Sequence, residues 1–368
     1  MHGFAVIHPG LEPVVAAELA GLGLEGEIVP GGVRFAADAA RVATLTRTMR
    51  TPSQMLLELA TGPARSPDAL GGLIKRIPWK QVLNPAAEVR VEVSTKGSRL
   101  HFKDTVTRAA TAMIRDARKT AYVADKGARP RVAQLVQVRV VDDVATISVD
   151  AGGDLLHRRG WRQDTVRAPI RENLGACLLA LAEWDGGDAL YDPFCGSGTL
   201  PIEAALLAAE RPPFGRRSFA CDEWVGASGP KRSKPGAPGA TPVRAPSHPP
   251  AVPIVGSDHH APTVLGAIQN AKRAGVSPSF RHLDVLQIEP PAVVGTVVTN
   301  PPYGERLGEH VDGTYTAFGR VLRERFQSWR VVFLSPDRRL AMRVDERVER
   351  LTTFKNGGLG VGVWTFLA

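Results

Sequence analysis

Residues 188–203 read Asp-Ala-Leu-Tyr-Asp-Pro-Phe-Cys-Gly-Ser-Gly-Thr-Leu-Pro-Ile-Glu, and this segment decides the fold class. The apolar run that ends at Asp192 predicts a strand, and the apolar stretch from Thr199, with proline in its first turn, predicts a helix. Gly196 and Gly198 allow the backbone between them to adopt conformations closed to other residues and to approach a ligand closely. A strand, a glycine turn and a helix at the carboxyl edge of a parallel sheet form a typical site for nucleotide-like ligands.

The composition of this turn narrows the class of ligand. A dinucleotide-binding turn has a glycine where this chain has Pro201, and the Gly-Lys-Ser/Thr of a phosphate-binding loop is absent. An acid, Asp192, ends the strand, which disfavours a pyrophosphate and favours a cationic ligand. The sequence therefore predicts S-adenosylmethionine as the cofactor, because its sulfonium and ammonium groups are both positively charged.

Two further predicted strands also end close to acids. Residues 254–258 form a strand that ends at Asp258, which is placed to accept hydrogen bonds from ribose hydroxyls. The next strand, at 281–283, is followed by Asp284, which can accept from the adenine amine. A single Asp after a strand is commonly a helix cap, but acids in register after three successive strands favour a cofactor site.

The fourth strand, at residues 295–299, runs into Asn300-Pro301-Pro302-Tyr303. The prolines end the strand and fix the backbone that follows it. The amide oxygen of Asn300 and the carbonyl of Pro301 can each accept one hydrogen of a planar exocyclic amine, and Tyr303 can stack on the base. The other interpretation is a purely structural turn with Tyr303 in the core, and we favour the substrate site.

Methylation of an exocyclic base amine explains the need for two acceptors. The lone pair of this nitrogen is conjugated into the ring, so the nitrogen is a poor nucleophile. Two fixed acceptors hold its N–H bonds, favour a pyramidal nitrogen and stabilise the positive charge that develops during an in-line transfer. This chemistry requires no metal and no separate general base. Cys195 suggests thiolate attack on a pyrimidine ring instead, but no basic residue lies nearby, and we interpret it as a small loop residue.

The first half of the chain has the pattern of α+β modules. Apolar residues at helical spacing predict a helix over 11–22, and a short strand at 33–35 precedes a second helix, which Asp38 caps. A third helix, with Asp104 as its N-cap, carries an apolar stripe. Strands around this helix are predicted at 55–59, 89–93, 136–140 and 145–149.

The formal net charge of +9 is unevenly distributed. Residues 1–167 hold 24 Lys and Arg against 17 Asp and Glu (+7), and the remaining residues hold 22 against 20 (+2). A basic helix face is commonly just solvated, but further basic residues flank the helix that follows Asp104, which favours a surface for a phosphate backbone. The predicted RNA-binding residues are Lys96, Arg99, Lys103, Arg108, Arg115, Arg118, Lys119, Arg129 and Arg131.

A basic linker over 156–168, with Trp161 in a domain interface, is predicted to join the two halves. From residue 169 onward, strands alternate with helices, beginning with a helix over 170–184, and this pattern predicts a mainly parallel sheet. Residues 225–253 are rich in Pro, Gly, Ser and Ala, and they predict a flexible insertion without an active-site role.

The composition excludes several classes of protein. Hydrophobic residues make up 43% of the chain and charged residues 23%, as in a globular protein. The 3 cysteines are widely spaced, which argues against a disulfide framework and a structural zinc site and fits a reducing cytoplasm. We find no export signal and no apolar run long enough to span a membrane. We expect a cytoplasmic protein that binds no metal, with a monomer as the default.

The motifs at 192–203 and 300–307 resemble those of the THUMP-domain guanine-N2 RNA methyltransferases, which act on large-subunit ribosomal RNA or tRNA. The likeness covers nearly the whole chain. His8-Pro-Gly-Leu-Glu resembles the opening of their ferredoxin-like domain, and Ile77-Pro-Trp and the helix near 104–120 resemble their THUMP domain. Their linker, the helix that closes over the cofactor and the final hairpin have counterparts at 156–161, 168–174 and 354–357.

The resemblance implies an α/β chain with a Rossmann-like class I methyltransferase domain at 169–368. An α+β ferredoxin-like domain (1–50), an RNA-binding THUMP domain (51–155) and the linker would precede it. The implied cofactor contacts, taken with those from the turn itself, are Pro169, Asp192, Phe194, Cys195, Gly196, Gly198, Thr199, Asp258, Asp284 and Asn300. Asn300, Pro301, Pro302 and Tyr303 would hold the guanine. Two features depart from the family pattern: the His259-His260 pair after Asp258, and the insertion.

Two other functions remain open at this point. Asn-Pro-Pro-Tyr also resembles adenine-N6 methyltransferases acting on DNA or RNA and protein glutamine-N5 methyltransferases, because all these substrates present a planar nitrogen. The RNA-type N-terminal domains argue against a DNA or protein substrate. A non-catalytic RNA-binding or ribosome assembly factor with a vestigial cofactor fold is the third possibility, and the intact motifs disfavour it.

Overall fold

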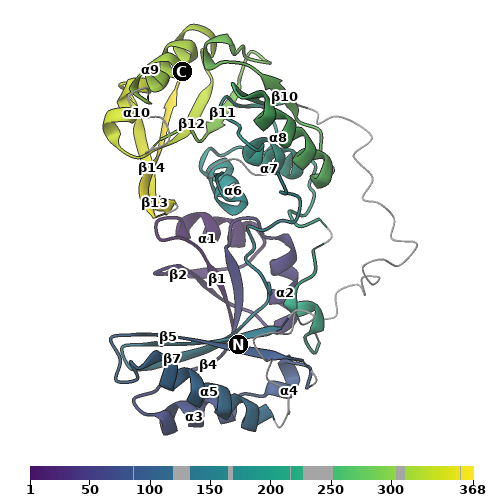
Figure 1. Cartoon of the computed structure of the whole chain (residues 1–368), viewed down its shortest axis with the longest axis vertical. Coiled ribbons are helices and arrows are strands. Elements are labelled where there is room, and N and C mark those ends of the chain that lie inside the picture. The colour runs from purple at the N-terminus through teal and green to yellow at the C-terminus, as the bar shows by residue number, and fades with distance from the viewer. Residues whose placement is uncertain are drawn as a thin grey trace, which may run out of the picture.

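The computed structural model describes residues 1–85, 87–118, 133–164, 169–215, 217–226, 252–303, 311–356 and 358–368. Within these ranges, two seven-stranded sheets organise the chain. Figure 1 shows an elongated molecule, with the sheet of the C-terminal half at the top and the sheet of the N-terminal half running through the middle and lower parts.

The N-terminal sheet has the strand order β2-β3-β1-β4-β7-β6-β5. All its neighbours pair antiparallel except β5 and β6, which are parallel. Its elements are β1 (His2–Val6), α1 (Glu12–Gly21), β2 (Gly26–Val29), β3 (Gly32–Ala36), α2 (Ala39–Thr48), β4 (Gln54–Pro63), α3 (Pro67–Arg76), α4 (Trp79–Val82), β5 (Val89–Lys96), α5 (Lys103–Arg118), β6 (Gln134–Val141) and β7 (Val144–Asp150).

Strand β4 connects the two predicted N-terminal domains. Its residues from Gln54 to Glu58 pair with β1, and those from Leu56 to Pro63 pair with β7, with a register shift between Glu58 and Ala60. A bulge of this kind bends a strand and increases its twist. The sheet is therefore continuous across the predicted boundary at residues 50 and 51, while the helices divide into a middle group (α1, α2) and a lower group (α3, α4, α5) in Figure 1.

The local predictions for this half are mostly confirmed. Asp38 caps α2 and accepts a hydrogen bond from the backbone N–H of Arg41. The apolar stripe of α5 is buried at Val106, Ala110 and Ile114. The prediction that Asp104 is the N-cap of this helix was wrong: α5 begins at Lys103, so Asp104 lies inside the first turn, where its charge still favours the positive end of the helix.

The C-terminal sheet has the order β10-β9-β8-β11-β12-β14-β13. Neighbours from β10 to β12 are parallel, and β14 pairs antiparallel with both β12 and β13. The elements are α6 (Glu172–Leu181), β8 (Ala189–Asp192), α7 (Thr199–Ala208), η1 (Ala220–Glu223), β9 (Ile254–Asp258), α8 (Ala261–Ala274), β10 (Ser279–His282), η2 (Val285–Gln287), β11 (Gly295–Thr299), α9 (Val311–Arg325), β12 (Arg330–Ser335), α10 (Arg338–Val344), β13 (Glu349–Asn356) and β14 (Leu359–Leu367).

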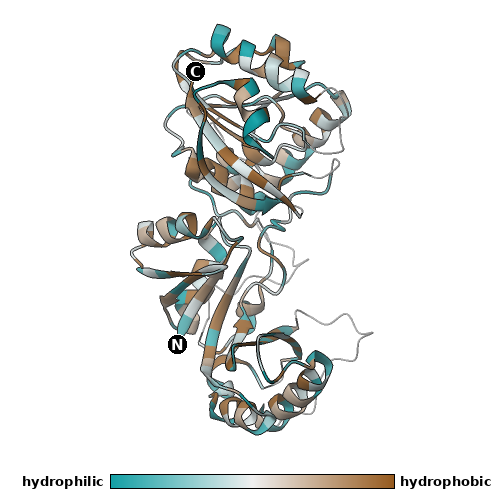
Figure 2. Cartoon of the chain, turned by 90° about the vertical axis from the view of Figure 1, so that its left-hand side faces the viewer, coloured by the Kyte–Doolittle hydropathy of each residue, from teal (hydrophilic) through white to brown (hydrophobic). Residues whose placement is uncertain are grey.

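The central strands of this sheet are covered on both faces. Every residue of β8 and β11 is buried, which is typical of a parallel sheet with helices on either side. Figure 2 shows hydrophobic (brown) ribbon in the strands inside the upper part of the molecule. The predicted α/β class with a mainly parallel sheet is thereby confirmed. Its strand order reverses between β8 and β11, and such a switch point opens a crevice at the carboxyl ends of the strands.

Trp161 of the linker is buried, with 3% of its surface exposed, and its place in a domain interface stays a prediction. The guanidinium of Arg159 is buried and forms an ion pair with Glu203 of α7, with 3.2 Å between Nε and Oε1. The same guanidinium donates to the carbonyls of Leu156 and Arg50. Arg159 therefore links Arg50 of the N-terminal half with Glu203 of the C-terminal half, and its bond to Leu156 lies within the linker.

The predicted insertion lies mostly outside the described residues, which break off between 226 and 252. Its first residue, Val225, donates its backbone N–H to the carbonyl of Val82 at 2.9 Å, and Trp224 forms an isolated bridge with Leu83. The chain therefore enters the insertion against α4 of the N-terminal half.

Candidate cofactor and substrate site

The switch point gathers the predicted functional residues at one edge of the sheet. Asp192 ends β8, Asp258 ends β9, and Asn300 directly follows β11. Asp192 is in register with Gly256 of β9, and Asp258 is in register with His282 at the end of β10. The strand ends thus bring the three side chains to the crevice that the sequence predicts.

The glycine turn after β8 requires glycine at both positions. Gly196 and Gly198 have φ values of 51° and 85°, in the left-handed region. A Cβ at Gly198 would lie 2.9 Å from the ring of Phe280. The turn is held against β9 by two hydrogen bonds, from the Gly196 N–H to Asp258 Oδ2 (3.1 Å) and from the Cys195 N–H to the Ser257 carbonyl (2.9 Å).

Asp192 is a buried acid with few partners. Its side chain accepts from the hydroxyl of Thr299 at 2.6 Å and from the N–H of Phe194 at 3.2 Å. Burial raises the pKa of this carboxyl to about 7, against the lowering effect of both hydrogen bonds, and the nearby charge of Asp258 raises it further. A cation bound beside Asp192 would favour the ionised form, so the carboxyl fits an ammonium or sulfonium ligand.

Asp258 and Asp284 also have structural roles. Asp258 Oδ1 accepts from the N–H of His260, so together with its bond to Gly196 this side chain orders the loops on both sides of it. Asp284 is exposed and caps η2, where its Oδ1 accepts from the N–H of Leu286 at 2.9 Å. Their predicted contacts with ribose and adenine stay predictions.

Three other predicted cofactor residues lie around the turn. Phe194 packs edge-on against Phe318, with 5.3 Å between ring centroids. Burial raises the pKa of the Cys195 thiol well above its usual value, so the thiol is protonated at neutral pH and unsuited to attack a pyrimidine. Pro169 precedes Ile170, whose carbonyl accepts from the guanidinium of Arg162 at 2.9 Å.

Thr199, another predicted cofactor residue, is the first residue of α7. This side chain is buried, and its hydroxyl accepts from Arg162 and donates to the carbonyl of Ile170 at 3.4 Å. These two bonds hold the chain that enters α6 and fix the segment beside Pro169. The predicted contact of Thr199 with the cofactor stays a prediction.

Asn300 has an acceptor that the fold leaves unused. Its Oδ1 is buried and has no hydrogen-bond partner among the described residues. A buried polar atom without a partner is costly, so a ligand that donates a hydrogen bond to this oxygen would be stabilised. The next two residues continue the turn, with Pro301 buried and Pro302 half-buried. The preceding residue, Thr299, hydrogen-bonds Asp192, so the substrate motif and the cofactor acid are directly connected.

Tyr303 lies deeper than the stacking interpretation requires. The residue is 2% exposed, and its hydroxyl accepts from the Nδ2 of Asn356 at 2.8 Å. The ring therefore belongs to the core in this structure, and stacking on a base remains a prediction that requires the ring to become accessible. Sequence reasoning did not identify Asn356 or Thr299, because both contacts depend on strand register and hairpin placement.

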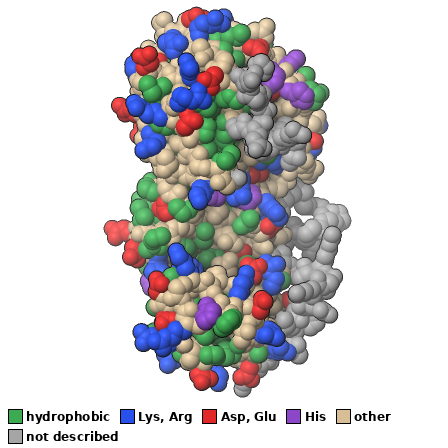
Figure 3. Space-filling view, turned by 60° about the vertical axis from the view of Figure 1, so that its left-hand side comes forward, with side chains coloured by type: hydrophobic (Ala, Val, Ile, Leu, Met, Phe, Trp, Pro, Cys, Tyr) green, Lys and Arg blue, Asp and Glu red, His purple; other side chains and the backbone are tan. Residues whose placement is uncertain are grey.

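The predicted RNA surface separates into exposed and buried members. Five of the predicted RNA-binding residues are exposed, and they lie on β5, on α5 or between these elements: Lys96, Arg99, Lys103, Arg108 and Arg115. Beside them, Phe102 is 69% exposed and its ring contacts that of His101, with 4.1 Å between centroids. The predicted residues Lys119, Arg129 and Arg131 lie outside the described residues. Figure 3 shows Lys and Arg side chains distributed over the upper, middle and lower parts of the face it presents.

The prediction that Arg118 faces RNA was wrong. Arg118 is 5% exposed, and its guanidinium donates to the carbonyls of Asn84 (3.1 Å) and Ala87 (2.9 Å). Burial lowers the pKa of this guanidinium. Arg118 follows Ile114 by one helical turn, so it shares the buried face of α5 and ties the helix to the loop before β5.

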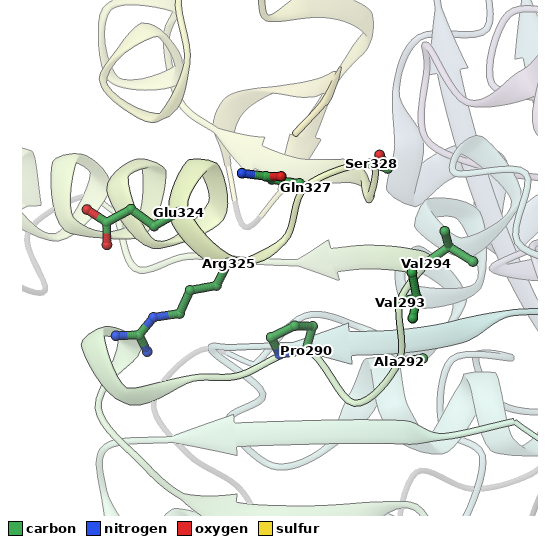
Figure 4. Close-up of a pocket in the computed structure, with 8 residues that line it drawn as sticks. All are labelled: Pro290, Ala292, Val293, Val294, Glu324, Arg325, Gln327 and Ser328. Carbon is green, nitrogen blue, oxygen red and sulfur yellow. The ribbon is translucent and has the colours of Figure 1, made fainter.

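A surface hollow elsewhere on the C-terminal half is separate from this site. Figure 4 shows its lining residues, which are Pro290, Ala292, Val293, Val294, Glu324, Arg325, Gln327 and Ser328. They lie in the segments that lead into β11 and β12, at the amino ends of these strands. The hollow is thus on the opposite edge of the sheet from Asp192 and Asn300.

The described residues contain no candidate metal site and no candidate membrane span. No cluster of three or more His, Cys, Asp or Glu side chains suitable for a metal ion occurs in this part of the chain. None of the helices described combines the length and the apolar character needed to cross a membrane.

Comparison with known proteins identifies two matching family models. The model of the RMKL-like methyltransferase domain matches residues 159–363. The model of the RlmL ferredoxin-like domain matches residues 3–56. The first match contains the glycine turn, Asp258 and Asn300.

Curated relatives are similar over nearly all of this chain. The ribosomal RNA large subunit methyltransferase K/L of Methylococcus capsulatus is 32% identical over 389 residues, which cover 99% of this chain and 50% of that protein. The protein of the same name from Chromohalobacter salexigens is 33% identical over 380 residues, covering 95% of this chain and 50% of its own length. The chain spans about half the length of these relatives.

Two solved structures share the whole fold. A predicted N6-adenine-specific DNA methylase from Listeria monocytogenes superposes with a TM-score of 0.83 and 26% identity, covering 100% of this chain and 96% of its own. TrmN from Thermus thermophilus superposes with a TM-score of 0.74 and 23% identity, covering 100% and 99%. The arrangement of two sheets and linker is therefore shared with known structures.

Proposed function

Since this chain belongs to the RMKL-like methyltransferase family, we propose that it transfers a methyl group from S-adenosylmethionine to the exocyclic N2 amine of a guanosine in structured RNA. The observation that carries the proposal is the Oδ1 of Asn300 at the carboxyl end of β11, which is buried and has no hydrogen-bond partner within the part of the chain that the structure describes. An oxygen in that position can accept a hydrogen bond from an exocyclic amine. The cytoplasm is the proposed compartment, and a monomer is the default.

The cofactor part of the site fits S-adenosylmethionine on two observations. The glycine turn permits close approach of the backbone, because both glycines take left-handed conformations. The carboxyl of Asp192 is buried and has a pKa of about 7, and a neighbouring cation would stabilise its ionised form. Asp192, Asp258 and the turn at 194–198 would hold the cofactor. When bound, S-adenosylmethionine supplies an electrophilic methyl group.

The chain's own residues would then prepare the nucleophile. Asn300 Oδ1 accepts one amine hydrogen and the carbonyl of Pro301 accepts the other, so the amine is held with its lone pair directed away from both acceptors. Thr299 fixes the turn relative to Asp192, with 2.6 Å between Oγ1 and Oδ1. Positioning and the stabilisation of developing positive charge together account for the acceleration.

Large-subunit ribosomal RNA is the first substrate to examine, and tRNA is the second. The relatives with about twice this chain's length are named as large-subunit ribosomal RNA methyltransferases. The exposed basic residues of β5 and α5 can contact phosphates, and the exposed ring of Phe102 can stack on an unpaired base. Methylation of adenine N6 is the alternative. An N6 amine would also donate a hydrogen bond to Asn300, and one solved structure is named as a predicted N6-adenine-specific DNA methylase.

Two substitutions test whether the amine and the cofactor are held by different residues. Asn300→Ala should abolish methyl transfer to RNA and change the cofactor Kd much less than Asp192→Ala does, because it removes the amine acceptor and leaves the acid and the glycine turn in place. Asp192→Ala should weaken both, because it removes the acid beside the cofactor. Transfer is measured with radiolabelled S-adenosylmethionine, and Kd by calorimetry. Normal transfer by Asn300→Ala would contradict the proposed mechanism.

A further inference from the structure

The hairpin of β13 and β14 connects the N-terminal half with the substrate motif. Figure 1 shows it reaching from the upper sheet towards α1 in the middle part of the molecule. Along β13, one residue contacts the loop before α1, and four positions later another contacts Tyr303. The roles proposed for Asn300 and Asp192 do not involve this connection.

The first contact joins β13 to Gly10. The hydroxyl of Thr352 donates to the carbonyl of Gly10 at 2.7 Å. The two backbones are so close that a Cβ at Gly10 would lie 2.0 Å from the carbonyl oxygen of Thr353. Gly10 itself is fixed within its own half, because its N–H donates to Glu12 at 2.6 Å. The hairpin therefore rests on an ordered turn of the N-terminal half.

The second contact joins the hairpin to the substrate motif. Asn356 ends β13, and its Nδ2 donates to the hydroxyl of Tyr303 at 2.8 Å. Asn356 is half-buried and Tyr303 is buried, so the bond is shielded from competing water. Tyr303 is only three residues from Asn300, across two prolines that stiffen the backbone. A displacement of the Tyr303 ring would be passed directly to the amine acceptors.

We infer that Asn356 is a positioning residue for methyl transfer, and that the N-terminal half controls the geometry of the Asn-Pro-Pro-Tyr turn through the hairpin. This inference rests on the proposed function, because Tyr303 matters to it only as part of the substrate motif. Asn356 acts through the Tyr303 hydroxyl and does not itself touch the cofactor or the amine.

A double-mutant cycle tests this inference. Asn356→Leu preserves the side-chain shape but removes the donor, and it should lower kcat for RNA methylation on the order of tenfold while leaving the cofactor Kd and the KM for RNA unchanged. In a Tyr303→Phe background, Asn356→Leu should have no further effect, because its hydrogen-bond partner is already absent. Thr353→Ala, on the exposed side of the same strand, is the matched control and should retain full kcat.

The outcomes separate this inference from the proposed function. Equal losses of kcat from Asn356→Leu in the two backgrounds would overturn the positioning role, because the effect would then not pass through the hydroxyl. If the unmodified protein transfers no methyl group to RNA, the proposed function fails, and the same cycle is evaluated in the free energy of unfolding. Additive unfolding free energies there would overturn the link between Asn356 and Tyr303.

Discussion

At the scale of the residue, Asp192 links the affinity for the cofactor to pH. The pKa of its carboxyl is raised to about 7 by burial. A bound cation lowers that pKa, so binding releases a proton when the pH is below it. The affinity for S-adenosylmethionine should therefore fall by up to about tenfold per pH unit below about pH 7 and become constant above it.

Calorimetry across this pH range measures the dependence. S-adenosylhomocysteine is the matched ligand, because it keeps the ammonium and lacks the sulfonium charge. A parallel dependence for both ligands would assign Asp192 to the ammonium, and a flat profile for S-adenosylhomocysteine would assign it to the sulfonium. An S-adenosylmethionine affinity that does not change through pH 7 contradicts a cation beside Asp192.

The sequence was sufficient to identify the residues that end strands. Asp192, Asp258 and Asn300 meet because consecutive parallel strands place their carboxyl ends at one edge of the sheet, and this rule can be applied to a sequence. The sequence was not sufficient for partners that come from distant elements. The pairing of Tyr303 with Asn356 depends on where the final hairpin folds back, and no local pattern specifies that.

At the scale of the element, the contact between Gly10 and β13 can be tested against a similar glycine. Gly10 has φ +98° and approaches the carbonyl of Thr353, whereas Gly31 has φ +88° and nothing within 4 Å of a built Cβ. Both substitutions with alanine introduce similar backbone strain. Only Gly10→Ala also displaces the hairpin, so it should lower kcat, and Gly31→Ala should retain it. Steady-state kinetics distinguish the two, and equal kcat values would contradict the role of the hairpin.

Helix α5 offers a second matched pair, because Arg115 is exposed and Arg118 is buried. Arg115→Ala should weaken RNA binding and reduce the slope of log affinity against log salt concentration by about 1, without changing stability. Arg118→Ala should lower the free energy of unfolding by about 1–3 kcal/mol, because the carbonyls of Asn84 and Ala87 lose a buried donor. Filter binding and urea unfolding check the pair, and an unchanged salt slope for Arg115→Ala would remove it from the RNA surface.

The two arginines also show why the sequence misplaced Arg118. The positions of Val106, Ala110 and Ile114 define the buried stripe, and Arg118 continues it at the same spacing. Its charge suggested exposure, but its long stem can lie along apolar surface while the guanidinium reaches two backbone acceptors. At this position, helical periodicity predicts the burial of the side chain correctly and its charge does not.

At the scale of the whole molecule, the two halves are joined by a buried ion pair. Arg159 of the linker and Glu203 of α7 both have fully buried side chains, whereas the neighbouring pair of Arg158 and Asp154 is exposed. Glu203→Gln leaves a buried guanidinium without its counter-charge and should cost about 3–5 kcal/mol of unfolding free energy. Asp154→Asn should cost less than about 1 kcal/mol. Urea unfolding compares them, and similar small losses would contradict a junction held by Arg159.

The overall architecture was predictable in one half and only partly in the other. Alternating strands and helices from Ala189 onward have the period of a parallel sheet, and the observed order agrees with it. In the first half the individual strands were predicted, but the continuity of one sheet through β4 was not. That continuity depends on pairing between β1 and β4, whose nearest paired residues, Val6 and Gln54, are 48 positions apart in sequence and share no local signal.

The identity of the methylated nucleoside decides whether the proposed function is right. The purified protein is incubated with labelled S-adenosylmethionine and with tRNA and ribosomal RNA fractions that lack their own modifications, and the digested RNA is analysed by mass spectrometry. The proposed function predicts labelled N2-methylguanosine in one of the fractions, and none with Asn300→Ala. Labelled N6-methyladenosine would contradict the assignment of the base, and no label from a protein that binds the cofactor would contradict RNA methylation itself.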